Sequence, residues 1–535
     1  MEFSSAVAFI FSILPLLLLL KLTFSWWVSP ILNHLKLKRC GFGGPLPSFP
    51  LGNIQEMKKK NSLSSSLGSS NLTHDIHSTV FPYFSRWQNS HGKVFIYWLG
   101  TEPFLYIADP EFLKKMSTEV LAKRWGKPRV FRHDRDPMFG NGLVMVEGNE
   151  WAMASMMTES TNQMIDRWIA QINSGNPKID VEREVVETAG EIIAKTSFGM
   201  KGKNAKEVSE KLRALQMTLF KTTRYVGVPF GKCFNVKKTL EAKKLGKEID
   251  KLLLSVITSR MKSIKRQTQE DLLGLLLQGN NNHQDDGKLG KTFTTRDLLD
   301  ECKTFFFAGH ETTALAISWT LFLLAMHEDW QIQLRDEIRE VVGDKELDIN
   351  TLAGLRKMKW VMNEVLRLYP TAPNVQRQAR EDIQVDNLTV PNGTNMWIDV
   401  VAMHHDPALW GKDVNEFRPE RFMNDVNGGC NHKMGYLPFG FGGRMCVGRN
   451  LSFMEYKIVL TLLLSRFSFK VSPGYNHAPS IMLSLRPTYG LLLIRSYLQK
   501  TREKLRCRLY RNLIRNLMAL FGNFLAQSGA VAVFN

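Results

Sequence analysis

The chain has 535 residues, of which 44% are hydrophobic and 10% aromatic, and its formal net charge is +19. This composition excludes wholesale disorder and leaves ample apolar residues for a core. Its six cysteines form no Cys-x-x-Cys pair and no dense cluster, which argues against a disulfide scaffold and a zinc site. The positive charge suits an acidic protein or an anionic membrane, whereas a nucleic-acid partner is not expected, because no recognition motif accompanies the charge.

The first predicted element is a membrane-spanning helix. Residues 7–28 are almost wholly apolar apart from Lys21 and end in a pair of tryptophans, which suits a bilayer span with an aromatic belt. A cleaved signal peptide is the weaker alternative, because Glu2 stands where such peptides carry positive charge. We therefore expect an N-terminal membrane anchor over residues 1–28.

A linker over residues 29–52 is predicted to follow the anchor. Its first part is basic, and by the positive-inside rule this charge keeps the rest of the chain on the cytosolic side of the membrane. Its second part, 41–50, is rich in glycine and proline, as expected of a semi-rigid connection. The anchor is thus single-pass, with the body facing the cytosol.

The body is predicted to be mainly α with a minor β region. Apolar residues recur mostly at helical spacing, whereas the short runs 93–98 and 104–108 resemble strands. The polar stretches 58–78 and 279–287 are expected to be surface loops.

One helix is expected to cross the whole body. From Thr295 to His327 there is no proline, and Thr294 or Thr295 can cap the start, which allows a helix of about 50 Å. The segment is apolar nearly all round, which in a soluble body indicates burial.

A polar interruption, Ala308-Gly-His-Glu-Thr-Thr313, lies in the middle of this helix. Burying a carboxylate and two hydroxyls is costly without partners or a purpose. A zinc-protease motif is excluded, because Ala314 stands where its second histidine would be. Taken alone, the segment leaves a structural threonine pair open.

A glycine-rich loop, Phe439 to Gly448, closes on Cys446 just before a helical pattern. The helix N-terminus favours negative charge, so the cysteine is expected to bind metal or act as a nucleophile through its thiolate. A dinucleotide-binding loop is a poor alternative, because Met445 occupies the third glycine position.

This loop matches the haem-binding signature Phe-x-x-Gly-x-Arg-x-Cys-x-Gly and resembles the cytochrome P-450 family. The resemblance implies a haem b cofactor, with Cys446 as the axial ligand to the iron. It places Phe439, Gly442 and Gly448 in the haem-binding loop, and Arg444 beside a haem propionate. It also implies a monooxygenase that receives electrons from NADPH through a reductase partner.

Other family motifs appear in the family's order. The distal-helix motif fits Ala308, Gly309, Glu311 and Thr312, which implies that Glu311 and Thr312 deliver protons during oxygen activation. The resemblance further implies the following assignments: Arg377 for a second propionate contact; Glu364, Arg367 and Arg421 for a buried ionic cluster; and 131–142, Ala308, 372–376 (with Ala372 and Val375), Pro487 and Thr488 for substrate contact.

The sequence around 125–128, 138–142 and 360–365 resembles that of the plant clan that hydroxylates hormones such as cytokinins, gibberellins and brassinosteroids. The resemblance therefore implies a haem domain over 53–494, anchored in the endoplasmic reticulum. It implies a small, largely apolar substrate, either a hormone or a specialised metabolite.

Two departures from the family pattern stand out. After Trp151 the sequence runs straight into a stretch that resembles a later helix, so part of a haem-flanking helix is expected to be missing. Residues 495–535 form a basic extension in which leucines recur at helical spacing; it is either an amphipathic helix at a membrane surface or a tail without function. An inactive, haem-deficient member, produced by a truncated transcript or gene model and acting at most as a membrane-bound interaction protein, is the alternative function.

Overall fold

The structure is a computed structural model, and its described residues include most of the expected haem domain. They are 15–58, 74–118, 125–126, 128, 130, 138, 150–200, 203–220, 228, 236–263, 271–274, 276–277, 294–343, 345 and 347–498. Most of the predicted loop 58–78, all of 279–287 and residues 499–535 of the extension lie outside this set.

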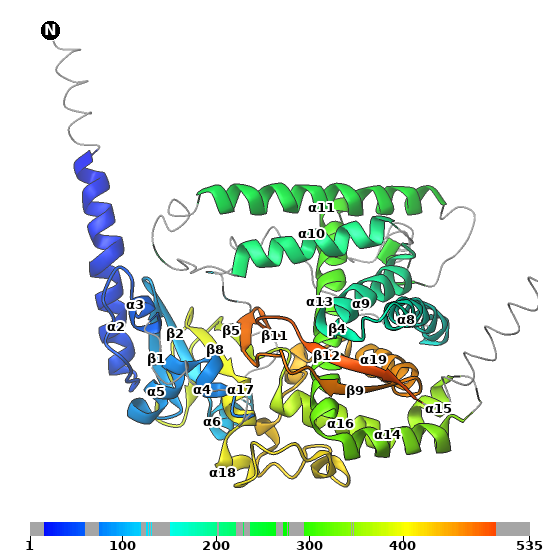
Figure 1. The fold of residues 1–535 in the computed structure, drawn as a ribbon. Coiled ribbons are helices and arrows are strands. Elements are labelled where there is room, and N and C mark those ends of the chain that lie inside the picture. Colours follow the sequence, from blue (N-terminus) through cyan, green and yellow to red (C-terminus); the bar gives the residue numbers. More distant parts are fainter. Residues whose placement is uncertain are drawn as a thin grey trace, which may run out of the picture.

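The body is mainly helical, as predicted, and its helices surround a long central one (Figure 1). The α-helices are α2 (Ser29–Arg39), α3 (Ile54–Met57), α4 (His77–Val80), α5 (Pro82–His91), α6 (Pro110–Thr118), α8 (Glu150–Asn173), α9 (Val181–Phe198), α10 (Lys203–Phe220), α11 (Val236–Ser263), α13 (Thr295–Met326), α14 (Glu328–Val341), α15 (Ile349–Gly354), α16 (Arg356–Leu368), α17 (Val400–His404), α18 (Pro407–Trp410) and α19 (Arg449–Leu464). A π-helical turn, η1 (Phe24–Val28), and three short 3₁₀ helices, η5 (Pro419–Phe422), η6 (Lys433–Gly435) and η7 (Gly442–Arg444), complete them.

The minor β region forms four small sheets. The strands are β1 (Val94–Leu99), β2 (Glu102–Ile107), β3 (Trp125–Gly126), β4 (Lys178–Asp180), β5 (Asn374–Ala379), β6 (Ile383–Val385), β7 (Leu388–Val390), β8 (Asn395–Asp399), β9 (Phe467–Val471), β10 (Pro479–Met482), β11 (Ser484–Pro487) and β12 (Leu492–Tyr497). The largest sheet has the order β1-β2-β8-β5-β3, and only the β2–β8 pair is parallel. β1 and β2 confirm the two strands predicted from the short runs 93–98 and 104–108.

The predicted central helix is α13, and it passes through the body behind β11 and β12 (Figure 1). Its start is fixed by a capping box, because Thr294 Oγ1 accepts from the Asp297 N–H and Asp297 Oδ2 accepts from the Thr294 N–H. Helices α9, α16 and α19 pack against α13 and bury nearly its whole length. The even apolar coverage seen in the sequence therefore reflects burial on all sides.

The N-terminal helix extends further than the sequence indicated. Among the described residues, one helix, Pro15–Arg39, is long and apolar enough to cross a membrane, and it projects from the body beside β1 (Figure 1). The first part of the expected linker is thus helical, as α2. Leu37 and Phe42 are buried against Ile96 and Trp98. This apolar contact seats the start of the linker on the sheet.

Helix α8 begins at Glu150 and continues without interruption to Asn173. Trp151 therefore leads directly into the stretch that packs against α9 and α19. In that stretch Met157, Met164 and Trp168 are fully buried. A single unbroken helix therefore connects Trp151 to the core at the place where we expected a haem-flanking segment to be missing.

Several buried histidines predict acid-sensitive stability. Burial lowers the pKa of His404 to about 3 and that of His477 to about 4. His404 Nε2 accepts a hydrogen bond from the Leu437 N–H, which requires a neutral ring. Because the folded-state pKa lies below the unfolded value of 6.5, this stability is complete above about pH 6.5 and is lost as the pH falls toward 4.

We expect each such histidine to reduce the free energy of unfolding by about 1.4 kcal/mol per pH unit in that window. Urea unfolding at several pH values checks the slope. His404→Asn is expected to flatten it, whereas His91→Asn, at the exposed end of α5, serves as the control. An equal slope in wild type and His404→Asn would contradict this account.

Candidate functional site

The glycine-rich loop is closed by its own backbone. The Cys446 N–H donates to the Phe439 carbonyl at 2.8 Å, and the Met445 N–H donates to the Gly442 carbonyl at 3.0 Å. Gly442 has φ +61°, a conformation that favours glycine. Gly448 then forms the N-cap of α19. The loop thus presents Cys446 as an exposed residue directly before a helix.

Surrounding protein atoms raise the pKa of the Cys446 thiol above its ordinary value, and a hydrogen bond from the Gly448 backbone partly offsets this effect. The thiolate form of Cys446 stays a prediction that concerns the metal-bound protein. A bound metal ion would displace the proton, as metal binding to thiols does.

Two predicted cofactor-binding arginines lie near each other. Burial and, to a smaller extent, the charge of Arg444, in η7, together lower the pKa of Arg377, on β5, to about 10. Arg377 donates to the Gln376 carbonyl at 3.0 Å, and among the described residues neither arginine has a carboxylate partner. Two guanidiniums without a counter-ion suit a ligand with two anionic groups. Their charge and the accessible thiol fit haem.

Helix α13 is buried along most of its length but is accessible near its middle. Ala308 is exposed and Thr312 is half-buried, and Thr312 Oγ1 donates to the Ala308 carbonyl at 2.9 Å. The next residue, Thr313, donates from Oγ1 to Ser452 Oγ at 3.2 Å. That bond ties α13 to the first turn of α19, close behind Cys446 in the sequence. The two predicted motifs therefore meet through adjoining helices.

Gly309 has a packing role. A Cβ atom at this position would lie 2.5 Å from Ile193 Cδ1 of α9. Real Cβ atoms do not approach so closely, so any other residue would displace the Ile193 side chain from its place between the two helices. The glycine thus permits the close contact of the two helices.

Glu311 is buried and held by partners that its sequence neighbourhood does not reveal. Gln216 Nε2 and Ser484 Oγ donate to its Oε1 at 2.9 and 2.5 Å, and Arg486 Nη1 lies 3.5 Å from the same atom. Burial alone would raise the pKa of Glu311, but the Arg486 charge leads the interactions that bring it below the ordinary value. Glu311 is therefore a buried, paired carboxylate.

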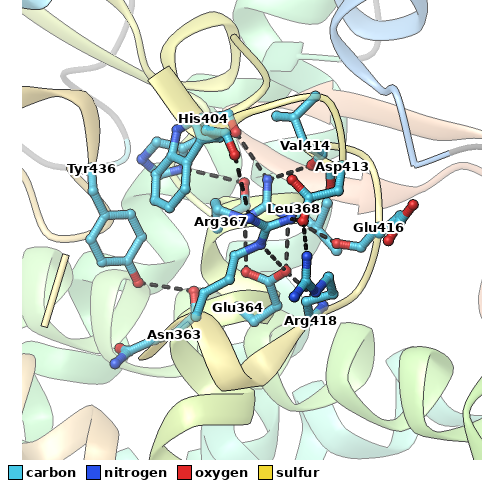
Figure 2. Close-up of polar contacts among 12 residues, drawn as sticks. Asn363, Glu364, Arg367, Leu368, His404, Asp413, Val414, Glu416, Arg418 and Tyr436 are labelled. Atoms are coloured by element: carbon cyan, nitrogen blue, oxygen red, sulfur yellow. Dashed lines mark hydrogen bonds and ion pairs between the residues drawn. The ribbon is translucent and has the colours of Figure 1, made fainter. Parts of the chain in front are cut away.

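Two members of the predicted ionic cluster, Glu364 and Arg367, lie side by side, and Figure 2 shows them with the polar contacts of Arg367. Arg367 Nε and Nη2 donate to the two carboxylate oxygens of Glu364 at 2.7 and 2.8 Å, and both side chains are fully buried. Arg367 also donates to the backbone carbonyls of three residues: His404, Val414 and Glu416.

Arg421 belongs to this cluster less directly than predicted. Its Nε lies 3.5 Å from Glu364 Oε1, whereas its Nη2 lies 2.7 Å from Asp413 Oδ2. Asp413 was not predicted from the sequence. It stands eight residues before Arg421, and this spacing indicates a contact only if the chain between the two residues folds back.

The predicted substrate-contact residues come from several segments. Ala308 lies on α13, whereas Ala372, exposed, and Val375, half-buried, lie just before and at the start of β5. Thr488 is exposed beyond β11, whose Leu485 N–H donates to the Thr371 carbonyl at 3.1 Å. Of 131–142, only Met138 lies among the described residues, and it is buried.

Comparison with known proteins gives a match over most of the chain. The family model described as cytochrome P-450 matches residues 68–495. Two cytokinin hydroxylases of Arabidopsis thaliana are 34% and 36% identical over 494 and 483 residues, covering 88% and 86% of this chain and 94% and 91% of their own lengths. Cytochrome P-450 714C2 of Oryza sativa subsp. japonica is 32% identical over 513 residues, covering 90% and 97%.

Proposed function

We propose, from the premise that this chain belongs to the cytochrome P-450 family, that it hydroxylates a small, largely apolar molecule. Family members are monooxygenases that use haem iron and electrons from NAD(P)H through a reductase. The observation that carries the proposal is the accessible Cys446 thiol on its closed loop. Arg377 and Arg444, without acidic partners among the described residues, and the opening of α13 at Thr312 support it.

In this proposal Cys446 would hold the haem iron through its thiolate, and Arg377 and Arg444 would pair with the propionates. The bound haem supplies the activation of dioxygen. Thr312 holds a proton beside the reacting centre with its hydroxyl, which is oriented by the Ala308 carbonyl. Ala308, Ala372, Val375 and Thr488 contact the substrate.

The relatives support a plant hormone or a specialised metabolite as the substrate class, since two of them are cytokinin hydroxylases. We further propose that helix Pro15–Arg39 anchors the chain in the endoplasmic reticulum membrane, with the body in the cytosol. There an NADPH-dependent reductase would deliver the electrons. The basic last turn of α2, with Lys36, Lys38 and Arg39, supports this orientation through the positive-inside rule.

A haem-deficient family member is the second candidate. Met445 and Val447, which flank Cys446, are 48% and 55% exposed. In the alignments with both cytokinin hydroxylases, the aligned length also exceeds the stretch of this chain that it covers, so the relatives carry residues that this chain lacks. The family match over 68–495, with its haem-binding loop, favours the catalytic proposal.

The carbon monoxide difference spectrum of the reduced protein tests the proposal. We expect the strongly red-shifted Soret band of thiolate-ligated haem, and substrate-dependent NADPH consumption with the reductase added. A second form, with the relatives' segment inserted after Trp151, is the matched comparison. A band in the second form alone would establish that this chain is haem-deficient.

Thr312→Ala is expected to retain haem while product formation falls by about 100-fold and peroxide release rises, because a positioned proton donor is lost. The amounts of product and of peroxide formed per NADPH consumed show how the reducing equivalents divide between the two. Thr313→Ala is the control, since Thr313 is buried against Ser452 and its loss costs about 1 kcal/mol of stability. An unchanged partition in Thr312→Ala would remove Thr312 from the mechanism.

A further inference from the structure

A buried network of charged side chains reaches Glu311 from the surface. Arg213 of α10, whose side chain is 38% exposed, donates from Nη2 to Glu182 Oε2 at 3.1 Å. Glu182 of α9 pairs through Oε1 with Arg486 Nη2, and Arg486 Nη1 lies 3.5 Å from Glu311 Oε1. Apart from Arg213, these charged side chains are at most 4% exposed.

Gln216 couples the arginine to the carboxylate. Its Oε1 accepts from Arg486 Nη1 at 2.8 Å, while its Nε2 donates to Glu311 Oε1 at 2.9 Å and to the Met482 carbonyl at 2.9 Å. Ser484 adds a third contact to the same carboxylate oxygen. Within the described part of the chain, Oε2 makes no polar contact with a side chain or backbone group. Glu311 is thus anchored through one oxygen.

The strand that carries Arg486 is fixed on both sides. The Leu485 carbonyl accepts from Trp319 Nε1 of α13 at 3.1 Å, and the Leu485 N–H donates to the Thr371 carbonyl. The backbone of Arg486 is therefore fixed beside the central helix, and its guanidinium is held there by Glu182 and Gln216. A guanidinium held so rigidly loses little further entropy when it orients a carboxylate.

We propose that Arg486 is a positioning residue that, with Gln216 and Ser484, anchors Glu311 by Oε1 and leaves Oε2 to hold or pass a proton beside Thr312. This inference rests on the proposed monooxygenase function for its catalytic meaning. Its structural content, that Arg486 keeps Glu311 ionised, stands on the contacts alone. The charged or titratable groups facing Glu311 are Arg486 of β11, His310 of α13, and the Glu182–Arg213 pair of α9 and α10.

The physical basis is the cost of a buried carboxylate without a cation. With Arg486 removed, Glu311 keeps only neutral donors from Gln216 and Ser484, because burial lowers the pKa of His310 and keeps that ring neutral. A carboxylate in such surroundings takes up a proton. A Glu311 that stays protonated could not take up a further proton, so it could no longer pass one proton after another.

Infrared spectroscopy of the protein tests this directly. Buried Glu455, whose pKa is raised to about 8, is expected to contribute a protonated-carboxyl C=O band in every form. In the difference spectrum of Arg486→Gln against wild type at neutral pH we expect an additional band of this kind, which disappears in Arg486→Gln/Glu311→Gln. Arg495→Gln is the matched control, because Arg495 is equally buried but donates to the Trp168 carbonyl and Gln171 Oε1. A spectrum of Arg486→Gln without that additional band would overturn the proposal.

Arg486→Gln also leaves Glu182 without its buried partner, so the charge-balanced pair Glu182→Gln/Arg486→Gln keeps the test available if the single variant does not fold. In the haem-bound protein, Arg486→Gln should shift the pH profile of product formation, and the shift should vanish when Glu311 is already glutamine. A shift that persists without Glu311 would show that Arg486 acts elsewhere. If no form turns over, the proposed function fails while the infrared result still decides the anchoring.

Discussion

Replacement of Cys446 by serine is expected to abolish the red-shifted carbon monoxide band and to lower product formation by more than about 100-fold. This is the upper end of the loss seen when only an outer-shell partner of a metal ligand is removed. A serine hydroxyl cannot supply the thiolate that sets the electronic character of the haem iron. Because the loop is closed by the Cys446 N–H and the Phe439 carbonyl, both backbone groups, its shape should survive the substitution.

Cys430→Ser is the matched control, because Cys430 is a free, partly buried cysteine that lies outside the closed loop. Its thiol donates to the His432 carbonyl, a contact that serine can reproduce. This variant should keep both the band and the activity. Retention of the red-shifted band in Cys446→Ser would show that another residue binds the iron.

Removal of Glu364 is expected to have the largest effect on stability. Glu364→Ala leaves the Arg367 guanidinium fully buried without a counter-ion, and breaking a buried pair in this way costs about 3–5 kcal/mol. The backbone carbonyls of His404, Val414 and Glu416 would still accept from Arg367, but they carry no net charge. We therefore expect this substitution to lower the free energy of unfolding rather than to act on the candidate site directly.

The chain offers a control with the same spacing. Asp336 and Arg339 form an i, i+3 pair on α14 whose side chains are 54% and 71% exposed. Asp336→Ala should cost less than about 1 kcal/mol, as exposed pairs do. Urea unfolding of the two variants beside wild type measures the difference. Equal destabilisation would show that burial is not what gives the Glu364–Arg367 pair its importance.

The sequence by itself determined the features that repeat along a short stretch of chain. The unbroken apolar coverage of 295–326 could only be satisfied by burial, so α13 was predictable as a central helix. The i, i+3 spacing placed Glu364 and Arg367 on one face of α16, where they do pair. The order of glycines around Cys446 marked a closed loop, because a φ of +61° at residue 442 favours glycine.

Only the tertiary structure decided which distant groups meet. Gln216 and Arg486 reach Glu311 from other helices and strands, so no local spacing could place them there. The same holds for Asp413, which takes most of the interaction of Arg421. Whether Cys446 is ionised was also undecided, because its pKa depends on how many protein atoms surround the thiol. Backbone periodicity can be read from the sequence. Desolvation and charge pairing depend on distances between groups that are fixed only after the chain has packed.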